Sequence, residues 1–200
     1  MFIQLEEINT PPEPFQFYTA ADLWTDEHTS KQMLRFHLDE GLDVSSRNIA
    51  FIDRSVDWIV SHFNSDTGKK IADFGCGPGP ALIAMGRESG FDMAGYDKFY
   101  ADQPELLTRR YDFITSTEVI EHLAAPRAVL DGLWACLNPG GVLVLQTQRV
   151  LGDERFKSWR YRHDPTHIVF FAEASFRALA ASWQADLCFP HTDVAVFTKP

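Results

Sequence analysis

The stretch IADFGCGPGP, residues 71–80, joins a short apolar run to a turn that holds three glycines. The apolar run predicts a buried strand over residues 70–74, and the pattern after the turn predicts a helix over residues 81–88. Glycine at such a junction permits positive φ and lets the backbone approach a ligand with no Cβ in the way. The helix N-terminus offers free N–H groups and the positive end of a dipole. The stretch therefore predicts a turn that binds a ligand with a carboxylate.

An acidic residue, Asp97, stands 18 residues beyond the last of these glycines, where a second predicted strand over residues 91–96 ends. A carboxylate there can accept hydrogen bonds from both hydroxyls of a ribose, a role that suits NAD as well as S-adenosylmethionine (SAM). The dinucleotide fingerprint is G-x-G-x-x-G, whereas the spacing here is G-x-G-x-G followed by Pro80. The spacing favours SAM over NAD, with an unliganded domain of the same fold as the other interpretation.

Strand and helix patterns alternate through the middle of the chain. The further elements expected are strands over residues 111–117, 142–147 and 193–198, a helical turn over 119–123, and helices over 126–137 and 173–183, with a turn at 138–141. This alternation predicts an α/β fold with a doubly wound, mostly parallel sheet and helices on both faces. The last strand is expected to close the sheet as part of an antiparallel hairpin.

The first third of the chain predicts helices rather than strands. Residues 22–39 and 49–63 carry apolar residues at helical spacing. We therefore expect residues 1–66 to form a helical extension that packs as a lid on the core, residues 67–200, within a single domain.

The bulk composition restricts the partners of this protein. The 200 residues carry a net charge of −10, which repels phosphate backbones and anionic lipids. No apolar run approaches the roughly 18 residues of a membrane span, and residues 1–14 lack the basic region of a signal peptide. The three cysteines have no metal-type spacing and fit a reducing compartment. We expect a cytoplasmic protein that acts on a small molecule, away from nucleic acid and membranes; its oligomeric state is not indicated.

Four segments together resemble the class I SAM-dependent methyltransferases: IADFGCGPGP, AGYD ending at Asp97, YDFITSTEVIEHL and LNPGGVLVLQT. The resemblance covers about residues 70–147 and implies SAM as the cofactor. It carries cofactor contacts to Asp73, Gly75, Gly77 and Asp97, and to the stretch Ser116 to Glu118, which includes Thr117. Gly79 of the glycine turn and Phe99 after Asp97 are further candidates for contact with the cofactor. More narrowly, the runs WTDEHTSKQMLRFHLDE and YRHDPTHIVFF resemble a bacterial branch of unassigned substrate, similar to the ubiquinone-pathway methyltransferases.

One departure from the family pattern lies between Asp97 and Tyr111. The usual member has a helix and another strand there, and the end of that strand supplies an acid or amide to the adenine. Only 13 residues intervene in this chain, and they include Pro104. We expect the strand to be reduced or missing, and Phe99 or Tyr100 to pack on the adenine instead.

The turn at Glu118, Glu121 and His122 is the first candidate for the chemistry. These residues stand at i, i+3 and i+4, so they share one face of a helical turn. The resemblance to small-RNA 2′-O-methyltransferases and to some ubiquinone-pathway O-methyltransferases implies a divalent ion here, with His167 as a fourth ligand. The same turn occurs in relatives without a metal. The main expectation is therefore a metal-free wall of the cofactor site, and the metal site is the alternative.

The run His163-Asp-Pro-Thr-His167 is the second candidate. It follows the strand that ends at Thr147, on the side where the carboxyl ends of parallel strands bind ligands. An imidazole among aromatic residues is a reasonable general base near neutral pH. We expect His167, His122 and His163 to be the catalytic candidates, with a loop-ordering role as the alternative.

Three functions remain open from the sequence. The main expectation is a SAM-dependent methyltransferase that methylates an oxygen or nitrogen of a small molecule. One alternative is an RNA 2′-O-methyltransferase with a divalent metal at Glu118, Glu121, His122 and His167. The other is a SAM-binding protein without catalysis.

Overall fold

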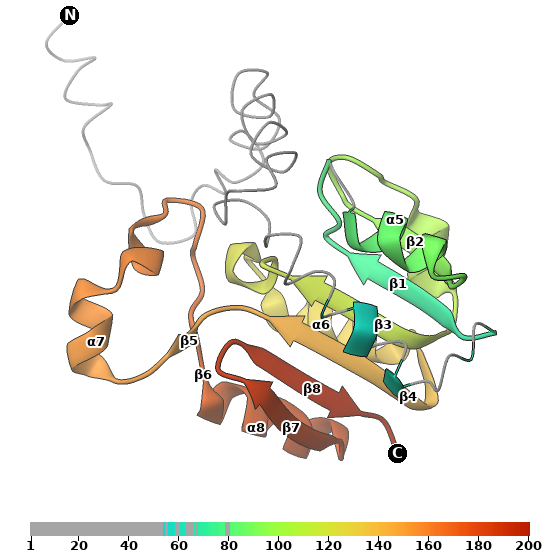
Figure 1. Ribbon diagram of the computed structural model, residues 1–200. Helices are drawn as coiled ribbons and strands as arrows, with labels where there is room; N and C mark the ends of the chain where they lie inside the picture. The colour runs from blue at the N-terminus through green and yellow to red at the C-terminus, as the bar shows by residue number, and fades with distance from the viewer. Residues whose placement is uncertain (1–53, 55, 59–60, 63–65, 67, 79–80) are drawn as a thin grey trace, which may run out of the picture.

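The computed structural model describes residues 54, 56–58, 61–62, 66, 68–78 and 81–200. Its centre is a six-stranded sheet with the order β2-β1-β3-β4-β8-β7 (Figure 1). The strands are β1 (Lys70–Phe74), β2 (Asp92–Tyr96), β3 (Tyr111–Thr117), β4 (Leu137–Gln146), β7 (Asp186–His191) and β8 (Val194–Thr198). The first four run parallel, whereas β8 is antiparallel to β4 and to β7. The predicted mostly parallel sheet and its closing hairpin are confirmed.

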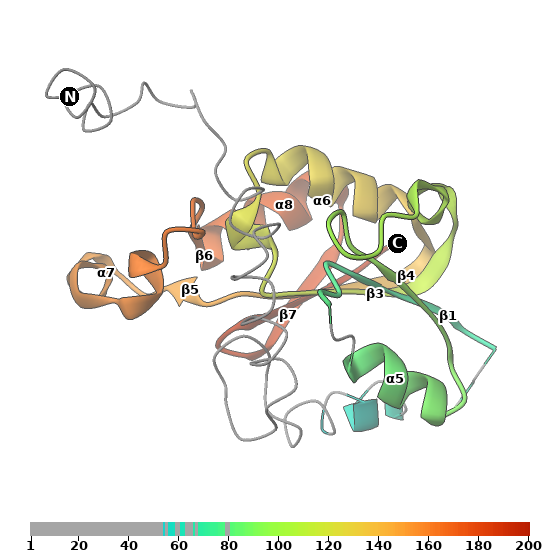
Figure 2. The same ribbon diagram turned by 90° about the horizontal axis from the view of Figure 1, so that it is seen from above.

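Helices cover both faces of this sheet. Figure 2 shows α5 (Ala81–Glu88) on one face, and α6 (Pro126–Ala135) and α8 (Glu173–Trp183) on the other. Each helix buries one apolar side, as helical spacing requires. The buried residues of the helices are Ile83 and Gly86 on α5, Leu130 and Leu133 on α6, and Phe176, Leu179 and Ala180 on α8. The doubly wound arrangement predicted from the alternation is therefore present.

The segment between β2 and β3 forms no strand of the sheet, as the sequence predicted. It makes one isolated bridge, from Asp97 to Ala101, and a 3-10 helix over Pro104–Thr108 that begins at the proline. A parallel crossover needs a dozen or more residues for its helix alone, so this segment is too short for a helix and a strand. Within the described chain, β2 is consequently the edge of the sheet.

A segment that the sequence did not predict follows β4. It comprises β5 (Arg149–Val150), α7 (Asp153–Ser158), a 3-10 helix over Arg160–His163 and β6 (Phe171–Ala172). β5 and β6 pair in parallel as a separate two-stranded sheet. In both views α7 projects away from the central sheet, beyond the carboxyl end of β4 (Figures 1 and 2). We call residues 149–172 the β5–β6 segment.

Two local predictions need correction. The expected turn at residues 138–141 lies inside β4, which begins at Leu137 and shifts its register against β3 between Tyr111 and Phe113. The helix expected over 126–137 ends at Ala135, because strand pairing with Tyr111 takes over at Leu137. Residues 138–141 stand opposite Asp112 alone, and Gly140 has φ +73°, so the local turn signal produces a bulge within the strand.

The N-terminal prediction is only partly within the described residues. The helix expected over residues 22–39 lies outside them. Of residues 49–63, the described ones are helical, and Val56 is buried. Trp58 stacks on His62 and lies 6.0 Å from Phe113, between ring centroids. In the described part of the chain, no helix has the length and apolar character needed to span a membrane.

Candidate functional site

The glycine turn after β1 needs glycine at Gly75 for two reasons. Gly75 has φ +84°, and a Cβ added there would come within 2.3 Å of Cγ2 of Val119. Its N–H donates to the carbonyl of Tyr96 at 2.7 Å, which ties the turn to the end of β2. Gly77 also has positive φ, at +63°. Gly79, predicted from the same motif, lies outside the described residues.

Asp97 is the residue that joins the turn to the loop after β2. Its Oδ2 accepts a hydrogen bond from the N–H of Gly77 at 3.0 Å. Its Oδ1 accepts from the N–H groups of Phe99 at 2.8 Å and Tyr100 at 3.1 Å. A carboxylate has about four lone-pair positions, so three are occupied and about one remains for a ribose hydroxyl. That the buried Asp97 binds the ribose stays a prediction. The same carboxylate also helps to shape the glycine turn.

Asp73 at the end of β1 is buried and accepts a hydrogen bond from the Thr115 hydroxyl at 2.6 Å. Burial raises the pKa of Asp73 to about 6; the Thr115 hydrogen bond lowers it and the nearby Asp97 carboxylate raises it. Burial and the same two carboxylates raise the pKa of the Cys76 thiol to about 12, so this thiol stays protonated. The turn therefore offers negative charge to a cationic ligand and carries no thiolate nucleophile.

Thr117 and Glu118 lie at the end of β3, at the same carboxyl edge as Asp73, which pairs with Thr115. Glu118 has φ +53°, uncommon outside glycine, and its N–H donates to the Gln146 carbonyl at 2.9 Å. Phe99 follows Asp97 in the neighbouring loop. These predicted cofactor residues share one edge of the sheet, where α/β proteins bind ligands.

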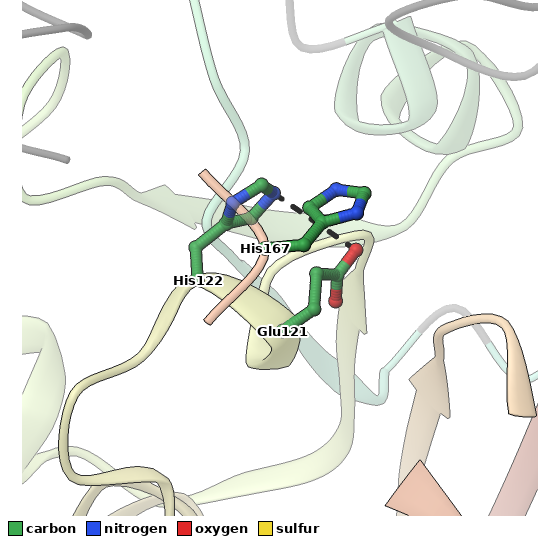
Figure 3. Close-up of side chains that lie close together, drawn as sticks. All are labelled: Glu121, His122 and His167. Atoms are coloured by element: carbon green, nitrogen blue, oxygen red, sulfur yellow. Dashed lines mark ion pairs between the residues drawn. The ribbon is translucent and has the colours of Figure 1, made fainter. Parts of the chain in front are cut away.

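Three predicted residues converge beyond this edge: Glu121, His122 and His167 (Figure 3). One ligand atom from each lies within 4.8 Å of the others. Glu121 and His122 belong to a 3-10 helix over Ile120–His122, whereas His167 comes from the β5–β6 segment. Glu121 is completely buried. Of the other two predicted residues, Glu118 is connected to the cluster through the Tyr161 hydroxyl, whereas His163 is exposed on the 3-10 helix of residues 160–163.

The backbone fixes which nitrogen of each histidine carries the proton. Nδ1 of His122 lies 3.0 Å from the Thr166 carbonyl, and Nδ1 of His167 lies 2.7 Å from the Tyr161 carbonyl. A carbonyl only accepts, so each Nδ1 carries the proton, and Nε2 of a neutral ring keeps its lone pair. Burial lowers the pKa of His122, which favours the neutral ring. Nε2 of His122 lies 3.9 Å from Oε1 of Glu121.

Tyr161, which the sequence did not single out, links these groups. Its hydroxyl lies 2.9 Å from Oε2 of Glu118 and 3.0 Å from the Thr147 hydroxyl, and it donates to Oε1 of Glu121. Its ring centroid is 4.0 Å from that of His167. Burial raises the pKa of both Tyr161 and Glu121. The only sequence signal was its place two residues before His163 in an aromatic run.

A family model described as a methyltransferase domain matches residues 45–187, more than half of the chain. The chain belongs to this methyltransferase family. The match confirms the prediction of a class I SAM-dependent methyltransferase, with SAM as the cofactor of the family. It begins within the predicted N-terminal extension, whose lid role stays a prediction.

Individual relatives agree with this family. The ubiquinone biosynthesis O-methyltransferase of Erwinia tasmaniensis is 30% identical over 127 residues, which are 52% of this chain and 51% of that protein. The enzyme of the same name from Acinetobacter baylyi is 24% identical over 169 residues, 72% of this chain and 65% of that protein. The chain spans about half the length of the curated relatives it matches.

Solved methyltransferase structures share the fold. Magnesium protoporphyrin IX methyltransferase from Synechocystis, with bound S-adenosylhomocysteine, matches with a TM-score of 0.62 and 16% identity, over 90% of this chain and 97% of that chain. The 1,6-didemethyltoxoflavin-N1-methyltransferase of Burkholderia thailandensis matches with a TM-score of 0.60 and 15% identity, over 96% of this chain and 92% of that chain. At these identities the likeness shows the Rossmann-like fold alone.

Proposed function

We propose that this protein transfers the methyl group of SAM to a hydroxyl group of a small aromatic molecule. The convergence of Glu121, His122 and His167 within 4.8 Å carries this proposal, because an oxygen acceptor needs a base and a nitrogen acceptor need not have one. The printed names of the relatives, which are O-methyltransferases, support the choice of oxygen.

The residues of the chain divide the work by position. SAM supplies an electrophilic methyl group when it is bound. Asp73, the glycine turn and Asp97 hold the cofactor at the carboxyl edge of β1 and β2. His167 accepts the proton of the acceptor hydroxyl at Nε2, since its Nδ1 proton is already donated to the Tyr161 carbonyl. The ring of His122, 4.8 Å from that of His167 between centroids, and the Glu121 carbonyl, which accepts from the N–H of Ile168, lie beside that proton acceptor and limit its movement.

Aromatic side chains of the β5–β6 segment support an aromatic acceptor. Trp159 stacks on Tyr161 with ring centroids 5.0 Å apart, and Phe170 lies 5.7 Å from Trp159. The indole N–H of Trp159 donates to Gln148 at 3.1 Å, which fixes the plane of the ring. Planar groups of this kind bind planar ligands by stacking.

A second candidate adds a divalent cation to the same cluster. Oε2 of Glu121 is buried without a partner among the described residues, and carboxylate and imidazole donors suit such an ion. Each histidine donates its other N–H to a backbone carbonyl, as metal-binding histidines do. Glu121, His122 and His167 would hold the ion, and it would lower the pKa of a bound acceptor hydroxyl.

Methyl-labelled SAM tests the proposal. The full chain is incubated with a set of phenols and catechols, with the matching aromatic amines, and with a short RNA carrying a free 3′ end. The expected result is label on the hydroxyl compounds only. Label on the amines or on RNA alone would overturn the proposal, and so would tight SAM binding with no transfer at all, which identifies the non-catalytic alternative. A chelator that leaves transfer unchanged would overturn the cation candidate.

A further inference from the structure

Tyr161 contacts the cluster through two different atoms. Its hydroxyl donates to Oε1 of Glu121, and its backbone carbonyl accepts from Nδ1 of His167 at 2.7 Å. The remaining member, His122, is held by the carbonyl of Thr166 at 3.0 Å. Tyr161 therefore contacts two of the three members of the cluster, one through its side chain and one through its backbone.

These contacts each engage one atom of the member concerned. Oε1 of Glu121 is held by Tyr161, and Oε2 has no partner among the described residues. The Nδ1 atoms of both histidines are held, and the Nε2 atoms of the neutral rings keep lone pairs. Nε2 of His122 lies 3.9 Å from Oε1 of Glu121, and Nε2 of His167 lies 3.9 Å from Oδ2 of Asp164. One carboxylate oxygen and two imidazole nitrogens can thus act as ligands without breaking any of these hydrogen bonds.

The position of Tyr161 in the chain makes this arrangement depend on the β5–β6 segment. The residue is 40 positions away from Glu121, in the 3-10 helix over Arg160–His163. Its hydroxyl also lies 3.0 Å from the Thr147 hydroxyl, at the end of β4, and its ring packs on His167. The N–H groups of Ile168 and Val169 donate to the carbonyl of Glu121 at 2.9 and 3.1 Å, so the segment returns to the cluster through backbone contacts as well.

We propose that Tyr161 is a positioning residue that holds Glu121 and His167 in the geometry that binds a divalent cation. The proposal rests on the cation candidate of the proposed function. Outer partners of this kind fix the tautomer and the orientation of a ligand, and their loss weakens metal binding by about 10- to 100-fold. Tyr161→Phe removes the hydroxyl and keeps the ring and the backbone carbonyl, so its effect reports on the hydrogen bond to Glu121 and leaves the one from His167 in place.

In the test, the full chain is first loaded with S-adenosylhomocysteine and is then titrated with Mn²⁺. Electron paramagnetic resonance measures the concentration of free Mn²⁺. Wild type is compared with Tyr161→Phe and with Tyr111→Phe. Tyr111 is the matched control, because its buried hydroxyl donates to the Leu106 carbonyl at 3.0 Å outside the cluster. We expect one bound Mn²⁺ in wild type and in Tyr111→Phe, at least about 10-fold weaker binding in Tyr161→Phe, and equal S-adenosylhomocysteine affinity in all three.

Equal Mn²⁺ affinity in wild type and Tyr161→Phe would overturn the proposal, and so would a wild type that binds no Mn²⁺. Should Tyr161→Phe lose S-adenosylhomocysteine binding, Thr147→Val replaces it, because this change removes a hydrogen-bond partner shared by the Tyr161 hydroxyl and Glu121. Weaker Mn²⁺ binding in that variant supports the proposal, and unchanged binding overturns it. Methyl transfer is measured separately. If Mn²⁺ binding depends on Tyr161 but no methyl group is transferred, the proposed activity is refuted and the positioning role of Tyr161 is still supported.

Discussion

Gly77 and Asp97 are joined by a hydrogen bond of 3.0 Å, from the glycine N–H to Oδ2 of the carboxylate. The acid that the sequence assigned to the ribose is therefore also the acid that holds the glycine turn against β2. The shape of the turn and the recognition of the sugar depend on the same side chain. Loss of the carboxylate is therefore expected to disturb the turn and to weaken binding of the ribose.

Replacing Asp97 by alanine is expected to abolish most SAM binding. The variant loses a hydrogen-bond acceptor for the ribose. It also leaves the N–H groups of Gly77, Phe99 and Tyr100 without this acceptor, and each such N–H that stays buried costs about 1 to 3 kcal/mol of stability. Isothermal titration calorimetry measures the affinity. Asp92→Ala is the control, since Asp92 is exposed at the other end of β2. Unchanged affinity in Asp97→Ala would refute the ribose assignment.

Gly75→Ala is expected to destabilise the protein more than Gly140→Ala. Both glycines have positive φ, +84° and +73°, so a side chain costs about 1 to 2 kcal/mol at either. Only at Gly75 does the added Cβ also clash with Val119, for a further 1 to 3 kcal/mol or so. Urea unfolding gives both values, and the double variant Gly75→Ala with Val119→Ala should recover part of the loss. Equal destabilisation by the two single variants would contradict the clash.

Asp73→Asn is expected to stabilise the cofactor-free protein at pH 7.5. The carboxyl has a pKa of about 6 when folded against 3.8 as its ordinary value, so the folded state binds more protons between these values. Its stability therefore falls as the pH rises through that window, by about 3 kcal/mol at most. Unfolding in urea at pH 4 and pH 7.5 should show the gain only at the higher pH. SAM affinity should fall, since the negative charge is lost; a gain equal at both pH values would argue against the shifted pKa.

His167→Asn is expected to lower the turnover number by about 100-fold, as loss of a general base does. His163→Asn is its matched control, four residues away in the same run, because His163 is exposed and lies outside the cluster. Turnover per SAM-binding site, with the acceptor found in the labelling experiment, separates loss of chemistry from loss of folded protein. Equal loss in both variants would assign the effect to the loop and not to the imidazole of His167.

The sequence predicted the elements whose signals are local. The apolar run of β1, the glycine turn and the helical spacing of α6 and α8 each lie within a dozen residues, and the structure confirms them. The missing strand followed from a count of residues between Asp97 and Tyr111. Each of these signals depends on the chain near it, so no tertiary contact was needed to interpret them.

The β5–β6 segment and the role of Tyr161 were beyond this kind of reasoning. The contact from Tyr161 to Glu121 spans 40 residues, and that from His122 to the Thr166 carbonyl spans 44. The two-residue strands β5 and β6 are too short to produce a pattern. The residue type at position 161 gives no hint that its hydroxyl and its carbonyl act on different members of one cluster. Only the folded chain shows that.

The order of strands in the sheet also has a consequence for biosynthesis. β4 pairs on one side with β3, which is already made, and on the other with β8, from Val142 with Thr198 to Gln146 with Val194. After each paired residue of β4, the ribosome must therefore add 48 to 56 more residues before the β8 residue that pairs with it has been made. Until then Leu143 and Leu145, both fully buried in the finished sheet, are held without β8 beside them. A nascent chain that stalls within this interval presents a long apolar strand edge, the kind of surface that chaperones bind and that drives aggregation.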